Sequence, residues 1–314
     1  MYKINNITLF YQNWFIIMYM FNKGLVIVNA FHLFGDYMHQ YERLKSELSK
    51  FNIGLSLVSN REILACIDSN GNVLAKNLPY DFIIYLDKDY YIAKMLETAG
   101  YKVFNNAEAI RICDDKMLTH LSLINNGIKM PKTINFPLKF FKDDDYKDFI
   151  ERVVIELGFP FIVKNSFGSL GEQVHLINNW QEIMEYEKHN HMKPHIFQEY
   201  IKSSFGQDFR LVTVGGKFVS SMHRITQNKN EFRSNIETGG IGTSERPPQS
   251  FIDMAEKIST LLSLDYCGLD FMFDEDGSPV FNEINANAFF GPIESFNPIN
   301  VGEAYAKYIV EKVY

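Results

Sequence analysis

Apolar runs alternate with amphipathic stretches through the first third of the chain. The segment 24–30 is continuously apolar, which is typical of a strand covered on both faces of a sheet. Apolar side chains then recur at helical spacing between residues 37 and 51, which predicts an amphipathic helix. The other elements expected before residue 112 are strands at 53–58, 81–86 and 101–104 and a helix at 93–99. This alternation predicts a parallel α/β domain.

Beyond residue 112 the pattern predicts helices interspersed with paired strands. A helix is expected at 112–126, ended by Gly127. Gly215-Gly216 and Asp274–Gly277 each separate two β-type runs, which indicates two hairpins. The other expected elements are strands at 161–164, 174–177 and 196–201 and helices at 146–157, 250–262 and 302–312. An α+β region therefore follows the N-terminal α/β domain.

The second hairpin, 266–285, carries acidic side chains between large apolar ones. Ideal pairing across its turn places Phe281 opposite Asp270, with Glu283 two residues further along the same face. Asn285 points the same way. Two carboxylates and an amide oxygen suit a hard cation such as Mg²⁺. The alternative is an exposed hairpin with solvated acids.

Two lysines and a loop of small residues are candidate anion-binding groups. Lys164 ends a β-type run and precedes the loop 166–171, whose backbone N–H groups could close over phosphates. Lys116 begins the helical stretch near two acids. The local alternatives are a solvated lysine and an ordinary glycine-rich turn. The order of a P-loop is absent, and the N-terminal domain lacks a G-x-G-x-x-G turn.

Two further polar stretches each allow two interpretations. The segment 227–242 is glycine-rich and is either a mobile surface segment or an active-site loop. His189, His191 and His195 surround Pro194 without a common face for a metal, which favours a polar connector.

Composition narrows the class of protein. With 314 residues, the chain can bury two or three sub-domains. A formal net charge of −7 argues against a nucleic-acid-binding surface. Cys66, Cys113 and Cys267 lack metal-ligand spacing and cannot all pair, which suits a reducing cytoplasm.

The first residues are strongly apolar between Ile7 and Phe21. This stretch is too short and too interrupted to span a bilayer as a helix, and no secretory cleavage site follows it. We expect a cytoplasmic protein without membrane attachment, with an added strand or arm here. The alternative is a translation start at Met20.

Taken in chain order, these features resemble the ATP-grasp superfamily, most closely the RimK-type glutamate ligases. The resemblance spans residues 24–314 and is strongest in the segments QEYIKSSFGQDFR, EFRSN and FNEINAN. The combined order of the motifs is far more specific than any single motif. The implied fold is an N-terminal parallel α/β domain followed by a two-lobed ATP-grasp domain.

The resemblance also implies four parts of the chain. They are an N-terminal extension at 1–23, an α/β pre-ATP-grasp domain at 24–112, a small lid lobe at 113–197 and a large lobe with the metal site at 198–314.

Nucleotide contacts are likewise implied by the resemblance. The expected phosphate-binding residues are Lys116, Lys164, Ser169, Arg233, Ser234 and Asn235. The expected base- and ribose-binding residues are Glu199, Tyr200, Ile201 and Asp208. Lys164 and Arg233 are the candidate catalytic residues.

The implied metal ligands are Asp270, Glu283 and Asn285, which would hold two Mg²⁺ ions with Glu283 shared; Mn²⁺ is an alternative. Arg224 and Asn287 are candidate substrate-binding residues.

The implied function is an ATP-dependent carboxylate–amine ligase. ATP would convert a carboxylate into an acylphosphate, which an amine then attacks. The expected partners are an amino acid such as glutamate and an amine-bearing peptide, protein or metabolite, with identical chains associating. Alternatives are a non-catalytic ATP-binding module and a ligase of the D-alanine or glutathione type.

Three departures from the family pattern stand out. Gln173 occupies a position where another glycine is common, and the segment 286–290 replaces a small residue, proline and glycine. Ideal pairing about the first hairpin turn puts Arg224 on the face opposite Asp208 and Arg210. Either a bulge re-aims Arg224 or its role as a substrate clamp is wrong.

Overall fold

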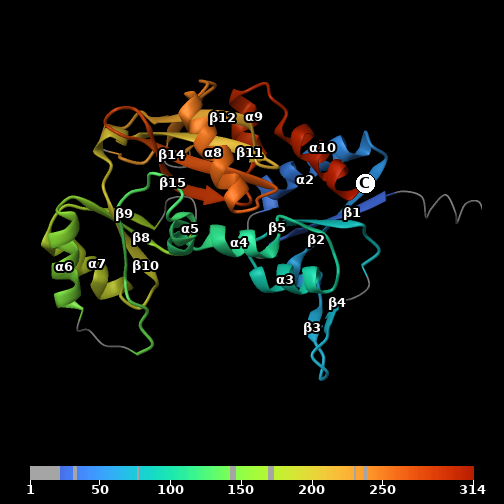
Figure 1. Cartoon of the computed structure of the whole chain (residues 1–314), viewed down its shortest axis with the longest axis horizontal. Coiled ribbons are helices and arrows are strands. Elements are labelled where there is room, and N and C mark those ends of the chain that lie inside the picture. Colours follow the sequence, from blue (N-terminus) through green and yellow to red (C-terminus); the bar gives the residue numbers. More distant parts are fainter. Residues whose placement is uncertain are drawn as a thin grey trace, which may run out of the picture. The chain divides into compact units, whose positions relative to one another are not determined.

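The structure is a computed structural model that describes residues 22–30, 34–75, 78–141, 146–168, 173–229, 231–236 and 239–314 (Figure 1). Residues 1–21 of the expected N-terminal extension lie outside these ranges. The described residues form two compact units. The first joins those up to Ala107 with Phe289–Gly291 and Asn300–Tyr314, and the second joins Glu108–Ala288 with Pro292–Ile299. The predicted mixed α/β fold is confirmed.

The first unit is built on a parallel sheet with the strand order β2-β1-β5-β6. Its central strands are buried along nearly their whole length, which explains their continuous apolar sequence. The elements of this unit are β1 (Asn22–Val28), α2 (Phe34–Ser49), β2 (Ile53–Ser59), η1 (Asn60–Glu62), β5 (Phe82–Leu86), α3 (Tyr90–Thr98), β6 (Val103–Phe104) and α10 (Val301–Val313). The four strands predicted before residue 112 are therefore confirmed.

The last helix, α10, groups with the N-terminal unit, whereas we expected it in the C-terminal lobe. It packs against α2, where Arg43 donates to Asn300 Oδ1 at 2.6 Å. Asn300 in turn donates to Glu47 Oε1 at 2.9 Å. These polar contacts join segments at opposite ends of the chain, so local sequence could not indicate them.

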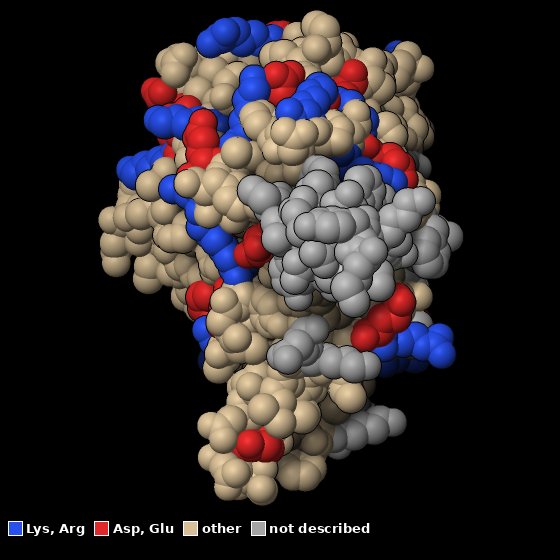
Figure 2. All heavy atoms as spheres, turned by 90° about the vertical axis from the view of Figure 1, so that its right-hand side faces the viewer, with Lys and Arg blue, Asp and Glu red and all other residues tan. Residues whose placement is uncertain are grey.

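A short hairpin, β3 (Ala65–Ile67) with β4 (Val73–Ala75), extends from this unit. Its side chains Leu64, Ile67 and Leu74 are exposed. Figure 2 shows the lower part of this face, where the hairpin projects, with few charged side chains.

The second unit contains two antiparallel sheets. The smaller has the order β7-β10-β8-β9 and packs with two helices around a core rich in phenylalanine. Its elements are β7 (Thr133–Asn135), α6 (Lys147–Leu157), β8 (Phe161–Asn165), β9 (Val174–Ile177), α7 (Trp180–Asn190) and β10 (His195–Glu199). One part of the expected polar connector is buried instead: His195 lies in β10 and its Nε2 is 2.9 Å from Glu187 Oε1.

The larger sheet has the order β13-β12-β11-β14-β15, with α8 packed against it (Figure 1). The two predicted hairpins form its centre and one edge. Its elements are η2 (Lys202–Ser204), β11 (Gln207–Val214), β12 (Lys217–Thr226), β13 (Gly240–Thr243), α8 (Gln249–Leu261), β14 (Tyr266–Phe273) and β15 (Pro279–Asn285). A short helix, α9 (Phe290–Phe296), follows.

The helix predicted at 112–126 is two helices, α4 (Ala107–Asp114) and α5 (Lys116–Leu123). Asp115 separates them and caps α5, because its carboxylate accepts from the N–H groups of Met117 and Leu118 at 2.9 and 3.1 Å. This break places Lys116 in the first turn of a new helix.

Among the described residues, no helix combines the length and apolar character needed to cross a membrane.

Candidate active site

A cavity of about 810 Å³, counted to its open mouth, lies in the second unit. Most of the predicted site residues line it: Lys164, Glu199, Tyr200, Ile201, Asp208, Arg224, Arg233, Ser234, Asn235, Asp270 and Glu283. Lys116 lines an adjoining pocket together with Lys164 and Glu283. Ser169 lies outside the described residues, and Asn285 and Asn287 do not line the cavity.

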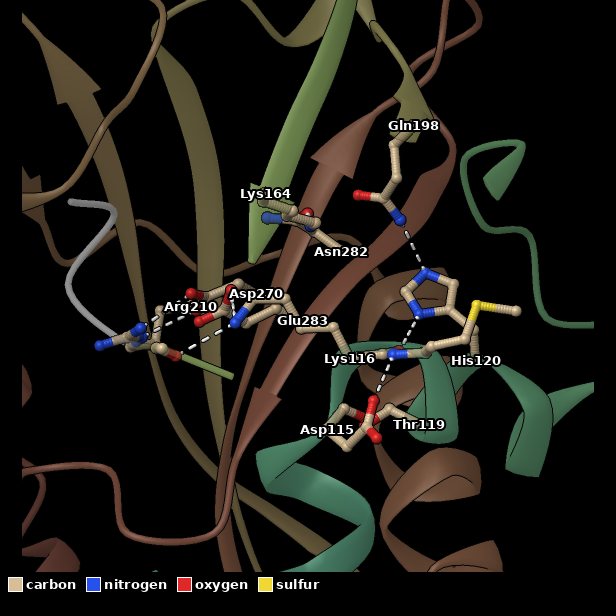
Figure 3. Close-up of polar contacts among 12 residues, drawn as sticks. Asp115, Lys116, Thr119, His120, Lys164, Gln198, Arg210, Asp270, Asn282 and Glu283 are labelled. Atoms are coloured by element: carbon tan, nitrogen blue, oxygen red, sulfur yellow. Dashed lines mark hydrogen bonds and ion pairs between the residues drawn. The ribbon is translucent and has the colours of Figure 1, made fainter. Parts of the chain in front are cut away.

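The two predicted lysines converge on Glu283 (Figure 3). Lys116 Nζ is 4.0 Å from Glu283 Oε2 and donates to the carbonyl oxygen of Gly168 at 3.1 Å. Lys164 lies in β8 and is only 3% exposed. Burial lowers the pKa of Lys164 to about 8, although the negative charge of Glu283 opposes that shift. The ammonium groups of Lys116 and Lys164 thus lie beside the carboxylate of Glu283. Negatively charged phosphate oxygens could replace this carboxylate or bind the two lysines together with it.

A β-bulge brings an unpredicted residue, Asn282, into the cavity. Asp270 pairs with Glu283 and the next residue, Phe271, pairs with Phe281, so Asn282 is the extra residue of β15. Its Oδ1 accepts from Lys164 Nζ at 3.1 Å. The predicted pairing of Phe281 with Asp270 is therefore wrong, and Glu283 itself lies opposite Asp270.

Asp270 is part of a buried charge cluster (Figure 3). Arg210 donates to both of its oxygens at 2.7 Å, and Arg224 Nη2 lies 2.9 Å from its Oδ2. Burial alone would raise the pKa of Asp270, but the two guanidinium groups outweigh it and hold that pKa well below its usual range. Arg224 also binds both oxygens of Asp208.

A second bulge explains why Arg224 reaches this cluster. Val212 pairs with Ser220, whereas Thr213 pairs with Phe218, so one extra residue is accommodated in β12. Asp208 consequently pairs with Arg224. Of the two sequence alternatives, the bulge is therefore correct. The guanidinium of Arg224 is occupied by protein carboxylates, and its predicted role as a substrate clamp stays a prediction.

The donor atoms present fit a magnesium ion. Asp270 faces Glu283 across the strands, and Asn285 pairs with Gly268 two residues along the same face. Arg210 Nε is the donor to Asp270 Oδ1, so that oxygen keeps a second lone pair; Asn285 Oδ1 accepts from the N–H of Asn287 and likewise keeps one. Carboxylate and amide oxygens gathered in this way are the ligands that Mg²⁺ prefers.

The segment that leaves β10, where the sequence analysis expects the nucleotide base to bind, forms part of the cavity wall. Glu199 binds the N–H of Lys132 through its carboxylate, and Tyr200 packs edge-on against Phe232. Gln198, which the sequence did not single out, also lines the cavity and is 2% exposed.

The predicted FRSN segment reaches the cavity in an ordered form. Arg233 makes a bidentate pair with Glu231, with both N–O distances at 2.8 Å. Ser234 is buried, and the carbonyl of Asn235 accepts from the N–H of Gly240 at 2.9 Å. Residues 232–235 of the segment 227–242, for which the sequence allowed either a surface segment or an active-site loop, therefore contribute to the cavity wall.

Acidification is expected to destabilise the protein through His120, a buried residue of α5. Burial, together with the charge of Lys164, lowers the pKa of His120 to about 4. The imidazole of His120 therefore binds a proton more tightly in the unfolded chain than in the folded protein. The unfolding free energy consequently falls as the pH decreases from about 6.5 toward 4. His120→Phe should reduce the loss between pH 7 and pH 5 by about 2 kcal/mol. Urea unfolding at both pH values measures this, and equal losses in the two proteins would contradict it.

Comparison with known proteins agrees with this arrangement. The matching family description is RimK-like ATP-grasp domain, over residues 113–309. The chain is 33% identical over 265 residues to "Uncharacterized protein MG012 homolog" of Mycoplasma pneumoniae, covering 82% of this chain and 88% of that protein. It is 30% identical over 223 residues to human "N-acetylaspartylglutamate synthase A", covering 71% of this chain and 56% of that protein.

Among solved structures, a RimK domain ATP-grasp protein from Sphaerobacter thermophilus matches with a TM-score of 0.67 at 19% identity, covering 91% of this chain and 99% of that one. The fold is therefore that of the ATP-grasp proteins. The chain belongs to the RimK-like ATP-grasp family. The expected family is confirmed, and with it the coarse class of an ATP- and Mg²⁺-using ligase.

Proposed function

We propose that this protein joins the carboxylate of one substrate to the amino group of an amino acid such as glutamate, or of a peptide, protein or small amine, at the expense of ATP. The observation that carries the proposal is the convergence of Lys116, Lys164 and Glu283 at a cavity lined by most of the predicted site residues. Positive charge and hard oxygen ligands are both needed where a phosphoryl group is transferred.

The reaction proceeds in two displacements. An oxygen of the substrate carboxylate attacks the γ-phosphorus of ATP, and ADP leaves. The amine nitrogen then attacks the acyl carbon, the carbon–oxygen bond to phosphate breaks, and the nitrogen loses a proton. Activation is required because a free carboxylate is a poor electrophile and hydroxide a poor leaving group.

Each step places a demand on residues of the cavity. Lys116 and Lys164 offset the charge that builds on the transferred phosphoryl oxygens, and Asn282 keeps the Lys164 ammonium in place. Arg233, which lines the cavity and pairs with Glu231, would stabilise the oxyanion formed when the amine adds. Asp270, Glu283 and Asn285 would hold Mg²⁺, which when bound supplies further charge neutralisation.

Water must be kept from the acylphosphate. Lys116 makes two hydrogen bonds to the described start of the loop after β8. Its backbone N–H donates to the carbonyl oxygen of Ser166, and its side-chain ammonium group donates to that of Gly168. The same side chain therefore links phosphate binding to the position of this loop, which supports a covering role for it.

The proposal that glutamate is a substrate is supported by the name of a relative, N-acetylaspartylglutamate synthase A. Because this chain spans about half the length of that protein, its substrates are carried over only as a proposal.

Amino acid-dependent ADP release tests the proposed function. Purified protein with MgATP is expected to release ADP only when both glutamate and an amine or carboxylate co-substrate are present, with mass spectrometry showing a product lighter by one water than the two substrates together. Pairwise screens over amino acids and acceptors define the substrates. Binding of MgATP without ADP release from any pair would favour a non-catalytic nucleotide-binding module.

A further inference from the structure

The amide of Gln198 is held in one orientation by two neighbours. Its Nε2 donates to Nε2 of His120 at 3.1 Å and to Oγ1 of Thr133 at 2.8 Å. Thr133 lies directly opposite Gln198 in the sheet, whereas His120 comes from α5. Both amide hydrogens are therefore used.

His120 and Thr133 can only accept these hydrogens, because each already donates its own hydrogen to a backbone carbonyl oxygen. Nδ1 of His120 lies 2.7 Å from the carbonyl oxygen of Lys116, which has no hydrogen to give, so Nδ1 carries the hydrogen and Nε2 presents a lone pair. The hydroxyl of Thr133 donates to the carbonyl of Pro131 at 2.8 Å, so its oxygen is left to accept.

Rotation of the amide would place its oxygen against both acceptors. The carbonyl oxygen is consequently directed elsewhere. Figure 3 shows it turned away from His120, on the side where Lys164 lies. Gln198 lines the cavity, and within the described ranges no hydrogen bond uses its Oε1. This residue of the cavity wall therefore carries a carbonyl acceptor whose orientation is fixed.

We propose that His120 is a positioning residue that sets the nucleotide preference of this protein by fixing the Gln198 carbonyl toward the purine 6-position. This rests on the proposed function, because it assumes that a purine nucleotide occupies the cavity. A 6-amino group, as in adenine, donates to this oxygen. A 6-oxo group, as in guanine or hypoxanthine, brings two acceptors together and leaves both unpaired, which costs binding free energy.

The affinities for three nucleotides distinguish this role of His120 from a general effect of its substitution on the cavity. Magnesium complexes of ADP, IDP and purine riboside diphosphate carry an amino group, an oxygen and no group at the 6-position. Isothermal titration calorimetry should show the wild-type protein binding ADP at least about a hundredfold more tightly than IDP. His120→Phe keeps an aromatic ring but removes one of the two acceptors, so only Thr133 is left to hold the amide and its rotation costs less free energy. The ADP/IDP preference should fall about tenfold or more, while affinity for purine riboside diphosphate stays within about twofold.

A matched control is provided by His191 in the small lobe. Its Nδ1 lies 2.8 Å from the carbonyl oxygen of Glu187, four residues earlier, so it repeats the local geometry of His120 outside the cavity. His191→Phe should leave the ADP/IDP preference unchanged. Gln198→Leu, which removes the carbonyl, should lower the preference at least as much as His120→Phe.

Nitrogen-15 NMR of histidine-labelled protein provides a second readout. The signals lost in His120→Phe should be those of a neutral ring protonated at Nδ1. A ring protonated at Nε2, or equal loss of affinity for all three nucleotides in His120→Phe, would overturn the proposal while leaving ATP-dependent ligation intact. A wild-type protein that binds none of the three would refute the proposed function itself.

Discussion

Glu283→Gln is expected to lower the rate of ADP formation by about a thousandfold or more while leaving the fold intact. Glu283 faces both the lysine pair and Asp270, so it is the carboxylate best placed to be shared by bound magnesium. The neutral amide would bind magnesium more weakly. The transition state, in which charge changes mainly on the transferred phosphoryl group, would therefore be less stabilised. A thousandfold loss corresponds to about 4 kcal/mol, which is within the range of such metal-dependent stabilisation.

The control for this substitution is Glu275→Gln, which makes the same change in the exposed turn of the same hairpin. It should retain the wild-type rate. Both variants should unfold close to the wild-type urea concentration, because the Glu283 side chain is 29% exposed and its ion-pair distance to Lys116 is as long as 4.0 Å. A Glu283→Gln protein with a near-normal rate would refute the proposed metal site.

Asp270→Asn is expected to destabilise the fold by about 3–5 kcal/mol, in contrast to the substitution of its neighbour. Asp270 is 5% exposed and neutralises two arginines, Arg210 and Arg224. With an amide at position 270, Asp208 is the one acid that still pairs with these arginines among the described residues, and it binds Arg224 but not Arg210. Removing one member of a buried ionic network costs more than the network itself contributes, since the remaining charge stays desolvated.

Urea unfolding of graded variants measures this effect. Asp208→Asn should cost less, because Arg224 keeps its contact with Asp270. Adding Arg210→Met to Asp270→Asn removes one of the two positive charges and should restore part of the lost stability. An Asp270→Asn protein as stable as the wild type would show that the charge cluster does not support the fold.

The predicted shared face of the two acids is observed, but strand alternation alone does not produce it. Phe273 pairs with Pro279 instead of Ser278, and the bulge at Asn282 then brings Glu283 opposite Asp270. The exact pairing could not be predicted. A bulge at Asn282 inserts a residue that no turn rule specifies, and its side chain is used by Lys164 from another sheet.

The arginines show the same limit. Arg210 lies two residues after Asp208 on one strand, so alternation could have placed both on one face. Its importance depends on β14 lying beside β11, where Arg210 pairs with Asp270. Arg224 required both this strand order and a second bulge before its side chain could reach the acids.

The sequence alone determined the types of element, the two hairpins, and the order of motifs that defines the family. These follow from backbone preferences and side-chain spacing over a few residues. The tertiary structure decided which groups neutralise Asp270 and how the amide of Gln198 is turned. His120 and Gln198 are 78 positions apart, and a hydrogen bond over that separation exists only once packing has brought the helix to the sheet.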